Sequence, residues 1–161
     1  MQLVAKLDSL RQPRLEAFIK LSEMLIPAPI TFLVDTGCSA TCLLPDDVIR
    51  LGIEHSLLPT VTKTIITANG PVILKQLHNV EISLPVRAGL LDRDGYVKVP
   101  MQQLPFLPPG PNYKQLPTNL VFSLLGMDVL NHFTKWKWGK TELIMEEPNQ
   151  SLQDLKMSLK L

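Results

Sequence analysis

The 161-residue chain has little net charge, few cysteines and no long apolar run, and each of these absences argues against a class of protein. Its 16 basic and 15 acidic residues give a formal net charge of +1, which offers no electrostatic attraction to nucleic acid or to an anionic membrane. No segment reaches the roughly 20 consecutive apolar residues that span a bilayer. The most apolar stretch, residues 24–34, is interrupted by Pro27 and Pro29. We therefore expect neither a nucleic-acid partner nor a membrane partner.

The first residues also lack the layout of a secretory signal, in which a basic end precedes an apolar segment. Lys6, Asp8 and Arg11 are instead spread through this part of the chain. We therefore expect a cytoplasmic location.

Two cysteines, Cys38 and Cys42, are too few for a disulfide scaffold. A zinc site built on them needs two further ligands, and the three histidines do not offer them at a recognisable spacing. We expect packed thiols, with no metal and no cofactor. A redox or metal module built on the two cysteines stays open as the weaker alternative.

The length suits one domain with a real core. The apolar share of 45% is high for a soluble monomer and suggests that a partner covers some apolar surface. We expect an N-terminal extension at residues 1–13, a domain at residues 14–148 and a C-terminal tail at residues 149–161. The extension carries leucines at helical spacing: Leu3, Leu7 and Leu10.

The most informative stretch is an apolar strand that ends in Asp-Thr-Gly at residues 35–37. Ile30, Phe32 and Val34 alternate with their neighbours, as in a mostly buried strand. An ionised Asp35 at its end is costly to bury unless it is paired, hydrogen-bonded or functional. Taken alone, Asp-x-Gly is more often a turn in which the carboxylate bonds its own backbone.

A second motif favours the functional interpretation. The string Leu33-Val34-Asp35-Thr36-Gly37-Cys38-Ser39 resembles the active-site signature of retropepsin-like aspartic proteases. Far downstream, Leu124-Leu125-Gly126 before a short helical pattern resembles the second signature of that family. The resemblance covers residues 15–147. It implies a mostly β fold: a single closed-barrel-like acid-protease lobe with one or two short helices, forming a symmetric homodimer.

The resemblance also implies a role for each matching residue. Asp35 is the catalytic acid, Thr36 bonds across the two-fold axis, and Gly37 exposes its backbone carbonyl to the substrate. Leu125 and Gly126 support the active-site loop. Many retropepsins brace the dimer with an Arg after the second Gly and an acid near the first. Those two positions here are Met127 and Ser39, so the brace is absent.

Hydrolysing a peptide with carboxylates takes two of them, one to accept a proton from water and one to donate a hydrogen bond to the carbonyl oxygen. No second Asp-Thr/Ser-Gly is found in the chain. The other candidate acids lack the flanking pattern: Asp92, Asp94, Asp128 and Asp154. The economical solution is a homodimer in which Asp35 meets its own copy.

A hairpin is expected where two β-branched runs, residues 61–67 and 72–84, flank an Asn-Gly pair. The resemblance implies that this hairpin is the flap over an extended peptide substrate. Its residues nearest the tip are Thr67, Ala68, Asn69 and Gly70.

Residues 86–119 match the family poorly and form a proline-rich insert. We expect an Asp-Gly turn at Asp94-Gly95. Six prolines between residues 100 and 117 predict a stiff, irregular excursion.

Elsewhere the patterns are simpler. Leu15, Ala17 and Ile19 predict a strand before residues 30–34. Pro45 predicts the start of a helix that ends at Gly52, with two acidic residues, Asp46 and Asp47, in its first turn. Residues 128–133 predict a short helix, and residues 143–145 a last strand.

The leading hypothesis is therefore an aspartic endopeptidase that acts as a homodimer on extended peptides. The alternative is a catalytically silent retropepsin-fold module for dimerisation or protein binding, with the proline-rich insert as its working surface.

Overall fold

The computed structural model describes residues 2–22, 24, 27–57, 60–67, 70–88, 93–116 and 122–148. Within these residues nine strands form one sheet in the order β7-β3-β2-β5-β1-β9-β8, with β4 and β6 also paired to β5. The strands are β1 (Gln2–Leu7), β2 (Pro13–Lys20), β3 (Ala28–Val34), β4 (Thr60–Thr67), β5 (Gly70–Ala88), β6 (Arg93–Phe106), β7 (Ser123–Leu125), β8 (Phe133–Trp138) and β9 (Glu142–Pro148). The helical elements are α1 (Pro45–Arg50), the 3-10 turn η1 (His55–Leu57) and α2 (Met127–Leu130).

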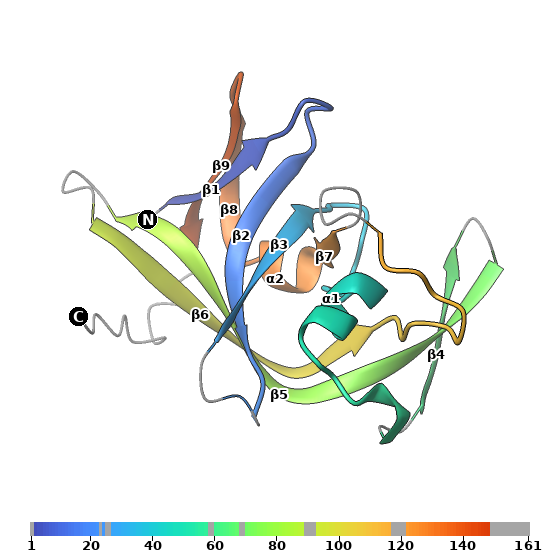
Figure 1. The fold of residues 1–161 in the computed structure, drawn as a ribbon. Helices are drawn as coiled ribbons and strands as arrows, with labels where there is room; N and C mark the ends of the chain where they lie inside the picture. The colour runs from blue at the N-terminus through green and yellow to red at the C-terminus, as the bar shows by residue number, and fades with distance from the viewer. Residues whose placement is uncertain are drawn as a thin grey trace.

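The sheet curls into a half-barrel around the apolar core, which agrees with the mostly β expectation (Figure 1). Figure 1 shows the two α-helices close to β3 and β7, with the β4–β5 hairpin on the opposite side of the molecule from β1, β8 and β9. The largest fully buried side chains come from strands far apart in the sequence: Phe32, Phe106, Ile19, Ile82, Leu104 and Leu125.

The hairpin of β2 and β3 confirms the first pair of predicted strands. Leu15 lies opposite Phe32, and Ala17 lies opposite Ile30. All four side chains are buried, while the residues between them face the other side of the sheet. The period of two in the sequence therefore reflects a sheet with one apolar face.

The helical spacing at the start of the chain gave a wrong prediction. Residues 2–7 form β1, which pairs with β9 over five residues and also contacts β2 and β5. Leu3 and Ala5 are fully buried at alternate positions. Ala5 is too small to strengthen a period-of-two pattern in the sequence, whereas Leu3, Leu7 and Leu10 happen to fit a helix.

A long hairpin of β5 and β6 overturns two further predictions. Asp94 and Gly95 do not form a turn, because they lie inside β6 opposite Arg87 and Val86. Pro100 and Pro105 also lie in β6, so the stretch up to Phe106 is regular rather than irregular. The strand tolerates prolines because β6 has β5 on one edge and, among the described residues, only a bridge from Leu43 to Phe106 on the other.

The predicted helix at Pro45 is confirmed as α1. Pro45 occupies its first turn, where its missing N–H is not needed. Gly52 follows the helix with a φ of 65°, a left-handed conformation that glycine adopts readily. The short helix and last strand expected near the end of the chain are confirmed as α2 and β9.

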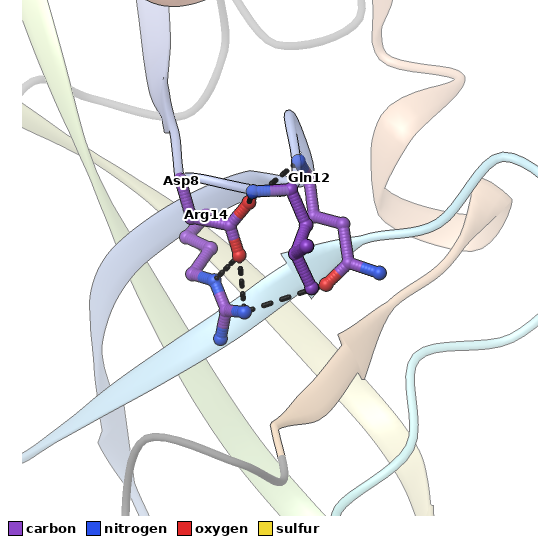
Figure 2. A network of polar contacts seen from close by, with 4 residues as sticks. Asp8, Gln12 and Arg14 are labelled. Carbon is purple, nitrogen blue, oxygen red and sulfur yellow. Dashed lines mark hydrogen bonds and ion pairs between the residues drawn. The ribbon is translucent and has the colours of Figure 1, made fainter.

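A polar turn joins β1 to β2 (Figure 2). The Asp8 carboxylate accepts the backbone N–H groups of Leu10 and Gln12, at 2.9 and 2.8 Å. It also forms a two-pronged ion pair with the Arg14 guanidinium. Arg14 in turn lies 3.5 Å from the centre of the Phe122 ring. The Gln12 N–H and the Arg14 cation lower the pKa of the Asp8 carboxyl.

In the part of the chain that the structure describes, no helix has the length and apolarity needed to cross a bilayer.

Candidate active site

Asp35 follows β3 at the point where β3 and β7 run side by side. These strands pair in parallel, with Val34 opposite Leu125. The Asp35 N–H continues this pairing by donating to the Leu125 carbonyl at 3.1 Å. The two predicted motifs, separated by most of the domain, are thus joined through their backbones.

The Asp35 carboxylate is held by the loop that follows it. Its Oδ1 accepts the Gly37 N–H at 2.8 Å, and the Asp35 carbonyl accepts the Cys38 N–H at 3.2 Å. Asp35 is half-buried, while Thr36 and Gly37 are exposed. A Cβ atom on Gly37 would lie 3.2 Å from Asp35 Oδ1, so glycine keeps the space beside the carboxylate open. The expected bond from the carboxylate to its own backbone is present, and it leaves Oδ2 without a hydrogen bond to the described residues.

Gly126 supports this loop from behind. A Cβ atom there would lie 2.4 Å from the carbonyl carbon of Ala40 and 2.7 Å from the Thr41 nitrogen, which is closer than atoms can approach. The next two N–H groups, of Met127 and Asp128, donate to the carbonyls of Cys38 and Ser39 at 2.9 and 3.2 Å. Backbone hydrogen bonds therefore attach the start of α2 to the loop that follows Asp35.

Sequence reasoning missed the side chains that complete this contact. The fully buried Thr41 accepts the Gly126 N–H on its hydroxyl at 3.0 Å and donates that hydroxyl to Asp128 Oδ1 at 2.7 Å. The Thr41 N–H also lies 2.9 and 3.0 Å from the two Asp128 oxygens. Thr41 and Asp128 are 87 positions apart, and neither carries a local signal of its partner.

The two cysteines lie within the same loop as free thiols. Cys42 is buried, and this burial raises the pKa of its thiol to about 12. The Cys42 backbone exchanges hydrogen bonds with Leu124, at 2.9 Å in each direction. Among the described residues, no three or more His, Cys, Asp or Glu side chains gather in a way that could hold a metal ion.

The expected hairpin is confirmed as the pair of β4 and β5. Thr67 lies opposite Gly70, and Ile66 opposite Pro71. Ala68 and Asn69, the two residues at the tip, lie outside the described part of the chain.

A pocket of about 310 Å³ lies apart from this loop, between α1 and the outer face of β2 and β3. Its two aspartates already have partners within the chain. The buried Asp46 accepts the Tyr113 hydroxyl and the Leu116 N–H at 3.0 and 3.1 Å. Asp47 accepts the Arg50 guanidinium and the Ser123 hydroxyl. Asp35 does not line this pocket.

Comparison with solved structures gives a match over most of the chain. The crystal structure of a retropepsin-like aspartic protease from Rickettsia conorii aligns with 90% of this chain and 90% of its own, with a TM-score of 0.53 and 22% sequence identity. The chain has the retropepsin-like fold. At this identity the likeness concerns the fold alone. No protein-family model matches the chain, and no curated protein sequence does.

Proposed function

We propose that the protein is an aspartic endopeptidase that works as a homodimer, with Asp35 of each copy forming half of the catalytic pair. The observation that carries this proposal is the placement of Asp35. Its carboxylate stands at the end of β3 on a tightly fastened loop, half-buried, with one oxygen bonded to Gly37 and exposed backbone beside it.

The chemistry requires a second carboxylate beside the first. Two carboxyls in contact cannot both ionise, so the pair shares one proton. Proton transfer by this pair accompanies the attack of water on the peptide carbonyl. The ionised member accepts the proton from water, while the protonated member donates a hydrogen bond to the carbonyl oxygen.

The chain's own Asp128 does not supply that second carboxylate. Both of its oxygens accept hydrogen bonds from Thr41, so they are directed at the base of the loop. A symmetric dimer supplies the missing acid as the Asp35 of a second copy. The proposed substrate is an extended peptide that pairs with backbone like an added strand, beneath the β4–β5 hairpin.

The first experiment compares wild-type protein with Asp35→Asn on unstructured fluorogenic peptides, between about pH 4 and 7. Asparagine keeps an oxygen for the Gly37 N–H, so the variant folds and assembles as the wild type does. The expected result is cleavage by the wild type and none by the variant. Equal cleavage by both proteins would exclude Asp35 as the catalytic acid.

The second candidate function is a catalytically silent module that binds another protein. It differs from the protease in one outcome: a confirmed dimer that cleaves no peptide in this pH range favours the silent module. A native mass measurement beside the cleavage assay therefore separates the two functions.

A further inference from the structure

We infer that Asp128 is a positioning residue for the active-site loop, acting with Thr41 within a single chain. This inference rests on the proposed function for its kinetic consequences. Its structural basis is a set of hydrogen bonds that converge on the end of the loop opposite Asp35.

The loop leaves the sheet at Asp35 and returns to it at Cys42. At its beginning the Asp35 N–H is bonded to Leu125, and at its end the Cys42 N–H is bonded to Leu124. Both ends are therefore attached to β7, and the six residues from Thr36 to Thr41 arch from one attachment to the other.

Thr41 holds the end of this arch. Its side chain is fully buried and uses the hydroxyl twice, accepting from Gly126 and donating to Asp128. Without the hydroxyl, the buried Gly126 N–H would lose its partner. Since Gly126 already touches the Ala40 backbone, a shift of Gly126 moves the loop with it.

Asp128 fixes Thr41 in turn. Its carboxylate receives the Thr41 N–H and hydroxyl and also its own helix's Val129 N–H at 2.9 Å. Asp128 itself lies at the surface, yet its hydrogen-bonding oxygens face inward. A surface carboxylate with this arrangement acts on the loop through Thr41, without touching the substrate.

Two substitutions at position 128 separate the effect of the hydrogen bonds from the effect of the charge. Asparagine at position 128 keeps Oδ1, which accepts three of the four contacts, but loses the charge and the Oδ2 contact with the Thr41 N–H. Glutamate keeps the charge but moves its oxygens outward by one methylene. If the bonds matter, Asp128→Asn keeps most of the wild-type kcat and Asp128→Glu does not. Misplacing a catalytic group by about 1 Å lowers a rate by roughly 100-fold, so we expect losses of that order for Asp128→Ala and Thr41→Val.

The experiment measures kcat, KM and native mass for these variants, with Asp46→Ala as the matched control. Asp46 also accepts one hydroxyl and one backbone N–H from a distant segment, but that segment lies at Tyr113 and Leu116. We expect Asp128→Ala, Asp128→Glu and Thr41→Val to lose kcat with KM and dimer mass unchanged. Asp128→Asn keeps most of the wild-type kcat, and Asp46→Ala loses stability and keeps kcat. The double variant Asp128→Ala/Thr41→Val should lose no more than either single variant, because the two residues act as one unit.

Amide hydrogen exchange gives a readout that needs no activity. The Gly37 N–H, bonded to Asp35 Oδ1, should exchange faster in Asp128→Ala and Asp128→Glu than in the wild type and Asp128→Asn. Unchanged Gly37 exchange, or a kcat order of Glu above Asn, would overturn the inference. If the wild type cleaves no peptide, the proposed function is wrong, and the exchange of Gly37 decides the positioning role by itself.

Discussion

Gly126 and Ala40 approach each other so closely that a methyl group on Gly126 would lie 2.4 Å from the Ala40 carbonyl carbon. The atoms in the way belong to the backbone, so no side-chain rotation relieves the clash. This contact joins the Leu124-Leu125-Gly126 motif to the loop that follows Asp35, in which Thr41 lies 85 positions before Gly126.

Gly126→Ala is therefore expected to lower the free energy of unfolding by about 1–3 kcal/mol, the usual cost of forcing extra volume into a packed site. Urea denaturation at a fixed protein concentration measures this. Gly110→Ala is the matched control, since nothing lies within 4 Å of a Cβ at Gly110. Equal stability of the two variants would show that the close approach of Gly126 is not needed.

Gly52 has open space around it, but its φ of 65° is unfavourable for any residue with a Cβ. Gly52→Ala should destabilise the protein by about 1 kcal/mol through backbone strain alone. The same denaturation series tests it, because Gly110→Ala adds a methyl group without a positive φ. A Gly52→Ala variant as stable as Gly110→Ala would contradict the assignment of Gly52 as a left-handed helix end.

Because of the Asp8 turn, we expect the stability of the fold to depend on pH in the acidic range. Because the pKa of Asp8 is lower in the folded chain than its ordinary 3.8, the ionised carboxylate stabilises the fold above that value. This contribution is lost as the pH falls through the lowered pKa. The urea midpoints of wild type and Asp8→Ala should differ at neutral pH and converge in strong acid. A difference that stays constant across this range would mean that the fold does not favour the ionised form of the Asp8 carboxyl.

For Cys42 we expect the opposite dependence on pH, because its contribution to stability is lost as the pH rises. Its pKa of about 12, against an ordinary 9.0, means that the folded chain holds the thiol proton more tightly than the unfolded chain does. The associated stability is complete below pH 9 and is lost as the pH rises toward 12.

Two measurements check this. Iodoacetamide should leave Cys42 unmodified in the folded protein at pH 8 and alkylate it in urea, since only the thiolate reacts. Cys42→Ala should lose less stability than the wild type between pH 9 and 11, since it has no thiol to deprotonate. Rapid alkylation of Cys42 in the folded state would instead support a redox or metal role for the two cysteines.

Local patterns in the sequence were enough to predict the strands next to Asp35, whereas the supporting role of Gly126 came from the family resemblance. The alternation of Ile30, Phe32 and Val34 reflects a sheet with one buried face. The alternation depends on neighbouring residues, so a short stretch of sequence contains it. The glycine after Leu125 allows the Ala40 backbone to approach closely. The close approach of Gly126 is to the distant Ala40 backbone, and it was predicted only through the resemblance of the two motifs to a known family.

Features that depend on distant partners were not predictable in this way. β1 is a strand because β9, more than 130 positions away, pairs with it along residues 2–6. Pro105 fits a strand because, among the described residues, the edge of β6 away from β5 meets only the bridge from Leu43 to Phe106, which no local pattern reveals. The bonds between Thr41 and Asp128 likewise arise only once β7 has been placed beside β3.

The central claim is that each chain supplies one carboxylate and takes the other from its copy. Refolding wild-type chains with an equal amount of Asp35→Asn chains tests it most directly, because the mixture contains wild-type pairs, mixed pairs and variant pairs. If both Asp35 residues are needed, only the wild-type pairs cleave, and the activity falls to about one quarter of that of the same total amount of wild-type protein. An activity of about one half would mean that each chain works alone, which contradicts the claim.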